Sequence, residues 1–177
     1  SQAAKLERHQ EKQALHRKDL QRKEKEKHSS VSFGAKCVEL CKQLRIFCPA
    51  IVFVFSKKRC IEAAQTVSAR SLLTPEEGPV YQKAIATLQR IYLQRYQELK
   101  DLSSFHSLMR YLNNGVCYHH SGMLPILREF VELCFQKKLV KVVFATETLA
   151  IGINMPAKTT VFSELKKPSI KGRRSLR

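Results

Sequence analysis

An α/β fold, with a mainly parallel sheet flanked by helices, is the fold class that this sequence predicts. Stretches with apolar side chains at helical spacing alternate with short runs rich in Val, Ile, Phe and Thr, which are typical of strands. These runs lie at residues 50–55, 116–119, 141–145 and 159–162. The alternation of strand and helix favours a parallel sheet joined by right-handed crossovers.

The first segment, residues 1–33, is predicted to be a charged helix or linker. Its first 30 residues are rich in Lys, Arg, Glu and Gln and contain no Gly or Pro. So few apolar side chains cannot offset the entropy of ordering a core. A solvated spacer is the favoured interpretation, and a nucleic-acid contact is the alternative, through Arg22, Lys23, Lys25 and Lys27.

The globular part is predicted to begin at residue 34. Residues 34–47 carry apolar side chains at spacings of three and four, so we expect an amphipathic helix packed on the sheet. The apolar run at residues 50–55 is typical of a strand buried on both faces. A helix from about Lys58 to Ser68 should then cross the sheet.

Residues 72–112 predict two further helices, joined near residues 101–104. Thr74 before Pro75 is typical of an N-cap followed by a proline in the first turn. We interpret this excursion as an ordinary cover of the sheet, and a docking arm is the alternative. A turn at residues 113–115 should end it, and a helix opened by Pro125 should follow the second strand.

Composition favours a polyanionic partner, nucleic acid above all. The formal net charge is +17, with 32 Lys and Arg against 15 Asp and Glu. A cationic surface that only aids solubility is the alternative. No apolar run is long enough to cross a bilayer, so we expect no membrane partner.

The six cysteines follow no regular framework, and no apolar leader precedes them. We therefore expect an intracellular, reducing setting, in the nucleus or the cytoplasm. Cys37, Cys41 and Cys48 lack a Cys-x-x-Cys pair, which favours the core over a zinc site.

Three motifs follow three of the predicted strands, so in a parallel sheet Ser56, His120 and Thr146 should open on the same edge. Residues 53–60 read Phe-Val-Phe-Ser-Lys-Lys-Arg-Cys, residues 118–125 read Tyr-His-His-Ser-Gly-Met-Leu-Pro, and residues 145–156 read Ala-Thr-Glu-Thr-Leu-Ala-Ile-Gly-Ile-Asn-Met-Pro. Together they resemble the second RecA-like domain of the superkiller (Ski-two-like) family of DExH-box RNA helicases, in superfamily two. The resemblance covers roughly residues 50–162 in the family's order, so residues 34–177 are expected to form part of that domain.

The resemblance implies two sets of site residues. Those implied to contact the RNA backbone are Ser56, Lys57, His120, Ser121, Gly122, Thr146 and Thr148, and those implied to face ATP are Gly152 and Asn154. Hydroxyls and backbone N–H groups in loops at strand ends do suit phosphate oxygens. Asn154 departs from the aspartate of related DEAD-box proteins, and Ile151 stands where those proteins have an arginine.

Two of these positions have competing interpretations. Ser56 can equally cap the helix that follows it, and both roles are compatible. His119 and His120 are adjacent, so in a strand they point to opposite faces and cannot easily share a metal ion. We expect one histidine in the core and the other in the RNA-facing loop.

The family's motor needs a first RecA-like half of the same parent protein, together with ATP and Mg²⁺. This chain contains neither a Gly-x-x-x-x-Gly-Lys-Ser/Thr loop nor an Asp-Glu-x-His motif, so we expect it to be inactive as an ATPase by itself. The family's Gln-x-x-Gly-Arg-x-Gly-Arg motif is also absent, which predicts a domain truncated before its last motif.

The resemblance implies single-stranded RNA as the main partner, with an RNA exosome or its adaptors as a further one. The function predicted for the chain is therefore the second motor domain of an ATP-dependent RNA helicase. A non-enzymatic basic RNA-binding or adaptor module with a helicase-like fold is the alternative, and a DNA-directed relative is a third possibility.

Overall fold

One four-stranded sheet forms the centre of the protein. The computed structural model describes residues 2–146, 157–163, 166–169 and 172–175. The sheet has the order β2-β3-β1-β4 with parallel neighbours, and its strands are β1 (Ala50–Phe53), β2 (Val116–His119), β3 (Val142–Ala145) and β4 (Thr159–Phe162). All four strand runs predicted from the sequence are confirmed in one parallel sheet.

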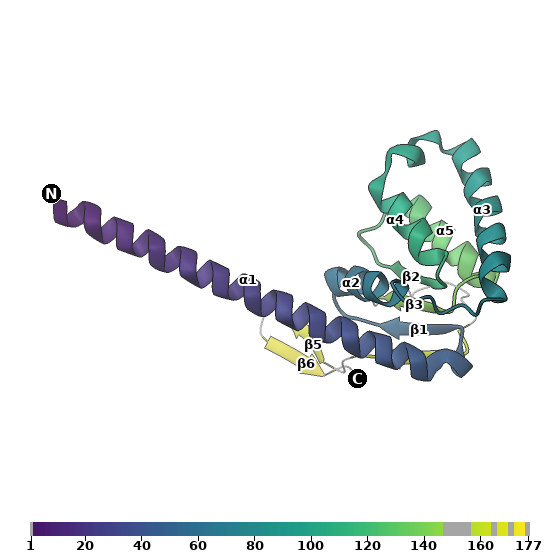
Figure 1. The fold of residues 1–177 in the computed structure, drawn as a ribbon, viewed down its shortest axis with the longest axis horizontal. Coiled ribbons are helices and arrows are strands. Elements are labelled where there is room, and N and C mark those ends of the chain that lie inside the picture. Colours follow the sequence, from purple (N-terminus) through teal and green to yellow (C-terminus); the bar gives the residue numbers. More distant parts are fainter. Residues whose placement is uncertain (1, 147–156, 164–165, 170–171, 176–177) are drawn as a thin grey trace.

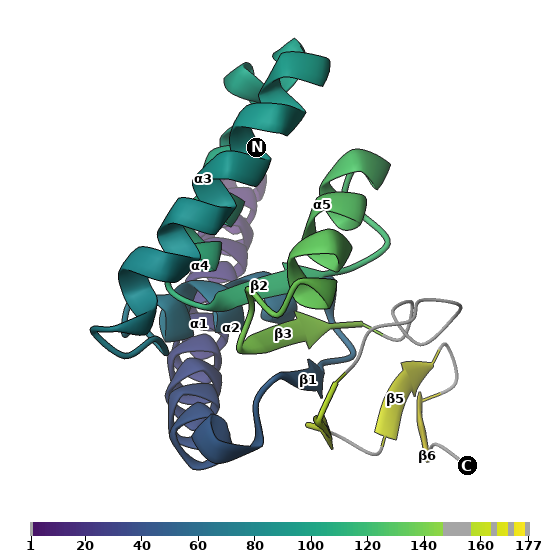
Figure 2. The same ribbon diagram turned by 90° about the vertical axis from the view of Figure 1, so that its right-hand side faces the viewer.

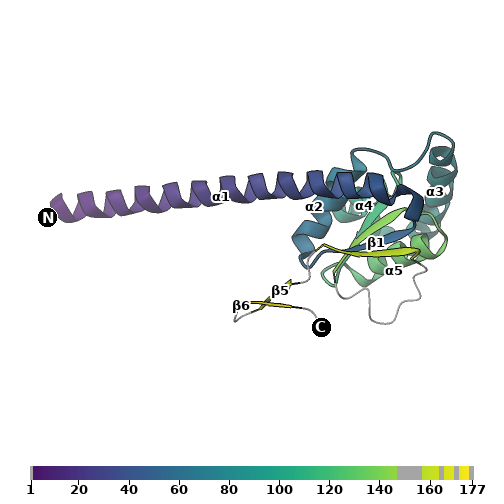
Figure 3. The same cartoon turned by 90° about the horizontal axis from the view of Figure 1, so that it is seen from below.

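Helices α2 (Lys57–Ser68) and α5 (Pro125–Gln136) cover opposite faces of the sheet (Figures 2 and 3). The chain crosses in one direction from β1 to β2 and returns from β2 to β3. Right-handed crossovers in opposite directions place their helices on opposite faces. Strands between two such layers are buried on both sides, and every residue of β3 is 0% exposed.

Helix α1 (Gln2–Leu44) is a single helix that extends well beyond the globular body (Figure 1). The sequence suggested a charged segment to residue 33 and a separate amphipathic helix from residue 34, but the helix runs through both. Its last turns pack on the body, with Cys37, Cys41 and Leu44 buried. A 3-10 turn, η1 (Arg45–Phe47), then leads to β1.

Gly34 lies where α1 crosses α2. A Cβ atom at this position would lie 2.8 Å from Thr66 Oγ1 and 2.9 Å from Thr66 Cγ2. The Thr66 side chain cannot easily turn away, because it is β-branched and its hydroxyl donates to the Glu62 carbonyl at 2.8 Å. Glycine therefore permits the close crossing, although a glycine inside a helix costs about 1 kcal/mol relative to alanine.

Helix α3 (Glu77–Arg95), the 3-10 turn η2 (Gln97–Asp101) and helix α4 (Ser103–Leu112) confirm the two helices predicted over residues 72–112. Thr74 Oγ1 accepts from the Glu77 backbone N–H at 3.2 Å, and the Glu77 carboxylate accepts from Thr74 N–H at 3.0 Å. This reciprocal pair is a capping box, which confirms Thr74 as a cap. Glu77 also accepts from Lys141 Nζ at 2.5 Å, which ties the start of α3 to the chain entering β3.

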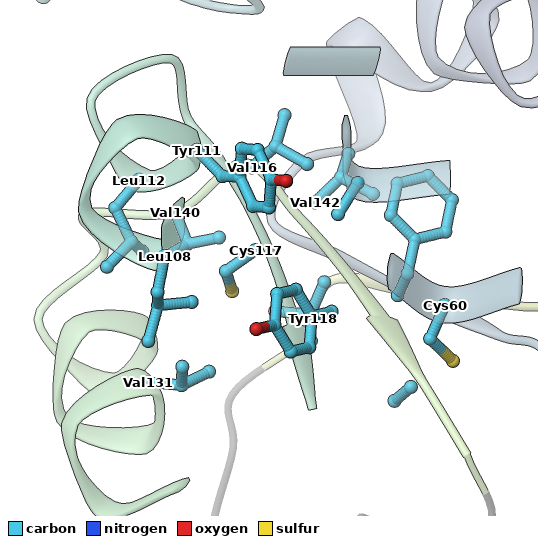
Figure 4. Packing of buried hydrophobic residues seen from close by; sticks show 14 of the residues in the cluster. Cys60, Leu108, Tyr111, Leu112, Val116, Cys117, Tyr118, Val131, Val140 and Val142 are labelled. Atoms are coloured by element: carbon cyan, nitrogen blue, oxygen red, sulfur yellow. The ribbon is translucent and has the colours of Figure 1, made fainter. Parts of the chain in front are cut away.

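The core joins the sheet to α4 and α5. Tyr111 of α4 packs on Tyr118 of β2, with ring centroids 6.1 Å apart, and Figure 4 shows Leu108 of the same helix near Cys117 and Val131. On the α5 side, Phe130 is fully buried and its ring meets that of Tyr92 of α3 edge to face, with centroids 4.7 Å apart. Helices α3 and α4 are therefore packed into the same core as the sheet.

The basic segment after β4 contains strands that the sequence did not suggest. β5 (Lys166–Ser169) and β6 (Gly172–Ser175) pair antiparallel as a separate two-stranded sheet. Lys, Arg, Gly and Pro168 carry little strand propensity, so the sequence gives no sign of these strands, whereas their pairing satisfies the backbone groups. Across the residues described, no helix combines the length and the apolar character that crossing a membrane requires.

Gly34→Ala is expected to lower the melting temperature, because its Cβ would collide with Thr66 where α1 crosses α2. The cost should shrink in a Thr66→Ala background, since that change removes both atoms closer than 3.0 Å. A double-mutant cycle by thermal unfolding measures this coupling. Equal losses from Gly34→Ala in both backgrounds would show that the crossing does not depend on this glycine.

Candidate nucleic-acid interface

The carboxyl ends of β1, β2 and β3 lie level at one edge of the sheet. Ala145 of β3 pairs with Phe53 on one side and with His119 on the other. Beyond these pairs, Val54 N–H donates to the Ala145 carbonyl at 2.7 Å, and Thr146 N–H donates to the His119 carbonyl at 3.2 Å. Ser56, His120 and Thr146, which follow these three strands, therefore lie at the same edge, as the sequence predicted.

Ser56 caps α2. Its backbone is extended, with φ −146° and ψ 123°, and its Oγ accepts from Arg59 N–H at 3.4 Å. The side chain is half-buried, and the adjacent Lys57 is exposed. A hydroxyl that accepts from a backbone N–H keeps its own hydrogen as a donor, so the cap leaves Ser56 able to donate to an anion.

The loop after β2 is a tight turn built around His120. Gly122 N–H donates to His120 Nδ1 at 3.0 Å, and Met123 N–H donates to the His120 carbonyl at 3.1 Å. A Cβ on Gly122 would lie 3.2 Å from His120 Nδ1 and 3.4 Å from Lys57 Cδ. Lys57 of the first motif therefore contacts the exposed turn of the second motif, where Ser121 and Gly122 face solvent.

Both histidines are buried. His119, 1% exposed, points toward α5, where its Nε2 lies 2.8 Å from Glu132 Oε1. His120, 6% exposed, stacks on Tyr118 with ring centroids 5.6 Å apart and planes 15° apart. His119 is thus the core histidine that the sequence predicted, and His120 begins the loop but is covered as well, because Tyr118 and the Gly122 turn enclose its ring.

The environment keeps His120 neutral. Burial lowers its pKa, and the positive charge of Lys57 and the proximity of His119 lower it further. Because Nδ1 accepts from Gly122, the neutral ring carries its proton on Nε2, which is buried with no hydrogen-bond partner among the described residues. Burial also lowers the pKa of His119, although Glu132 opposes this shift.

Thr146 follows β3 directly and is 8% exposed. Its backbone N–H donates to the His119 carbonyl of β2, which fixes Thr146 beside the end of that strand. Thr148, Ile151, Gly152 and Asn154, the other residues discussed for the third motif, lie outside the described residues.

Two positions at this edge were missed by sequence reasoning. Glu132 holds His119, and Tyr118 supports the His120 ring. The signal for Glu132 was a carboxylate between the apolar residues Val131 and Leu133 of α5, which is uncommon on a packed face. The cysteines behave as core residues where they are buried: burial raises the pKa of Cys37 to about 11 and that of Cys41 to about 12.

No family model matches the chain, but it is similar in sequence to several known proteins. It is 41% identical to the DExH-box ATP-dependent RNA helicase DExH10 of Arabidopsis thaliana over 123 residues, or 70% of this chain. It is 42% identical to Superkiller complex protein 2 of Homo sapiens over 119 residues, and 39% identical to the ATP-dependent RNA helicase mtr4 of Schizosaccharomyces pombe over 120 residues, each 67% of this chain.

The chain belongs to the superkiller family of DExH-box RNA helicases. Its matches cover 12%, 9% and 10% of those three relatives, so it corresponds to a small part of each. The parallel sheet flanked by helices is the RecA-like fold expected of a helicase domain in this family. The superkiller family therefore accounts for both the sequence and the architecture.

Substitutions at Ser56 are expected to separate its two roles. Ser56→Ala should lower the free energy of unfolding by about 0.5–1 kcal/mol, because the cap of α2 is lost. Ser56→Asp should preserve stability, since aspartate is an equally good cap, but it should weaken RNA binding because its charge repels phosphate. Chemical unfolding and RNA titration of both variants measure these effects. Unchanged RNA affinity in Ser56→Asp would leave Ser56 as a cap alone.

The free energy of unfolding should fall as the pH drops from 7.5 to 5.5. The pKa of His120 is lower in the folded protein than in the unfolded chain, where it is near 6.5, so the unfolded chain binds the proton more readily. His120→Asn should flatten this slope, since an amide oxygen can accept from Gly122 without titrating. The matched control is His28→Asn on the exposed part of α1. Denaturant unfolding across this pH range tests the point, and equal slopes in all three proteins would refute it.

Proposed function

We propose that this chain is the second motor domain of an ATP-dependent RNA helicase and that it holds single-stranded RNA by its backbone. The observation that carries the proposal is the position of Ser56, His120 and Thr146 at the carboxyl edge of one parallel sheet. Open α/β sheets bind their ligands at this edge. Membership of the superkiller family supports RNA as that ligand.

The groups at the edge suit phosphates rather than bases. Ser56 and Ser121 offer hydroxyl donors, and Lys57 offers an exposed ammonium against the Gly122 turn. Gly122 presents no side chain, so the RNA backbone can approach the protein backbone closely. Phosphate contacts carry little sequence information, so the grip should be nearly independent of RNA sequence.

His120 contributes by positioning. Its ring is buried, and its Nδ1 fixes the Gly122 backbone N–H. The neutral ring therefore holds the turn that carries Ser121 and Gly122 in place while those two residues face the RNA. Thr146 and Thr148 are assigned to the same RNA strand.

ATP, bound together with Mg²⁺, would supply through its binding and hydrolysis the free energy for closing and opening the motor. In this proposal Gly152 and Asn154 complete the ATP site from the second domain, and the phosphate cradle and metal-binding carboxylates belong to the first RecA-like domain of the parent protein. This division agrees with the absence of a Walker-type loop and an Asp-Glu-x-His motif from the chain.

A basic RNA-binding or adaptor module is the second candidate, supported by the net charge of +17. The two candidates differ in the full-length protein, where RNA-stimulated ATP hydrolysis supports the motor and its absence supports the adaptor. One relative is named as a superkiller complex protein. We include an RNA exosome or its adaptors among the proposed partners of the parent protein.

Thr146→Ala should weaken binding of single-stranded RNA to the chain, at a cost of about 1–3 kcal/mol if its hydroxyl bonds a phosphate. Thr146→Ser should retain most of the affinity because it keeps the hydroxyl. Thr160→Ala, on the exposed side of β4, is the matched control. Fluorescence anisotropy with labelled RNA measures all three. An equal effect of Thr146→Ala and Thr160→Ala would remove Thr146 from the site.

The chain alone should show no ATP hydrolysis above background. In the full-length protein, Asn154→Ala should raise the ATP concentration needed for turnover and spare RNA binding measured without nucleotide. Thr146→Ala should do the reverse. Parallel losses of RNA binding, ATP binding and melting temperature in both variants would contradict the division of this loop into an RNA side and an ATP side.

A further inference from the structure

A groove of about 530 Å³ lies between α1 and the start of α2. Ser56, at the sheet edge, forms part of its wall, so the groove adjoins the proposed RNA site. Figure 3 shows α1 passing along α2 and continuing beyond the sheet. Five cationic side chains line the groove: Lys18, Arg22, Lys25, Lys58 and Arg59.

The positive charge of the groove is only partly compensated. The two carboxylates that line the groove form only long ion pairs with its cations. Glu62 lies 3.9 Å from Lys58 Nζ, and Glu26 lies 4.0 Å from Arg22 Nε. Arg22 is engaged more closely by Asp19, at 2.8 Å. Lys18 and Lys25 form no ion pair with any described residue, so their ammonium groups are available to an anion.

The wall formed by α1 is held in place by specific contacts. Arg59 Nη2 donates to Ser29 Oγ at 3.5 Å, and the Arg59 guanidinium lies 5.0 Å from the centre of the Phe33 ring. The Gly34 crossing described above lies next to these contacts. Lys18 and Lys25 are seven residues apart, hence on the same face of α1, and the helix from Lys18 to Ser29 is about 16 Å long.

We propose that this groove is a second RNA-binding surface, which carries the single strand away from the sheet edge past Ser56. The inference rests on the proposed function, because it requires RNA at the sheet edge. A nucleic-acid backbone is the partner that fits, since the groove is elongated, is rich in cations and continues a site suited to phosphate. Flexible lysines contact phosphates as point charges, so this surface should add affinity without sequence preference. Part of α1 then acts as a binding arm rather than as a spacer.

The test compares two double variants with equal loss of charge. Lys18→Ala with Lys25→Ala changes the groove. Lys27→Ala with Lys83→Ala is the control, because Lys27 is about 180° around α1 from Lys18 and Lys83 lies on α3. Alanine favours helix, so α1 should stay folded, and circular dichroism checks this. Binding of a short and a long single-stranded RNA is measured by anisotropy over a range of salt concentrations.

The groove variant should bind the long RNA about 25-fold more weakly near 0.1 M salt than the wild-type chain, because two phosphate contacts are lost at about 0.7 in salt slope each. Binding of the short RNA, which reaches only the sheet edge, should be weakened by the groove variant little more than by the control variant. Equal losses of affinity for the long RNA in the groove and control variants, or no loss in either, would overturn the proposal that the groove binds RNA.

The test also separates this inference from the proposed function. If Thr146→Ala weakens RNA binding and the groove variant does not, the groove is not an RNA-binding surface and the sheet-edge site stands. If the wild-type chain binds neither RNA, the proposed function itself fails.

Discussion

The register of β3 between β1 and β2 is the constraint on which the candidate site depends. Ala145 is level with both Phe53 and His119, and two backbone hydrogen bonds beyond these pairs extend the alignment to Val54 and Thr146. A shift of one residue in β3 would turn its side chains to the opposite faces and would separate the loops. Complete burial of β3 under helices on both sides opposes such a shift.

This alignment brings residues from different loops into contact with one another. The Gly122 turn contacts Lys57, a residue 65 positions earlier, only because the ends of β1 and β2 reach the same level. The same contact places a cation near His120 and helps to keep that ring neutral. One end of the sheet therefore combines a capped helix, a tight turn and a cationic side chain, a set of groups that is suited to a phosphate backbone.

The sequence predicted the parts that depend on local chemistry. Continuous apolar runs located the four strands of the main sheet, and the alternation of strand and helix placed Ser56, His120 and Thr146 at one edge. Features that depend on tertiary contacts were not predictable. Gly34 was taken as a boundary, because its fit against Thr66 is visible only when α1 crosses α2. The pairing of β5 with β6 was likewise hidden by residues of low strand propensity.

Amide hydrogen exchange of the chain with and without single-stranded RNA tests the central claim most directly, because it locates the ligand on the native protein. The account predicts slower exchange in the turn after β2, at Ser121–Met123, and at the start of α2, with little change in α3 and α4. Protection confined to α3 and α4, with unchanged exchange at the ends of β1, β2 and β3, would contradict an RNA site at the carboxyl edge of the sheet.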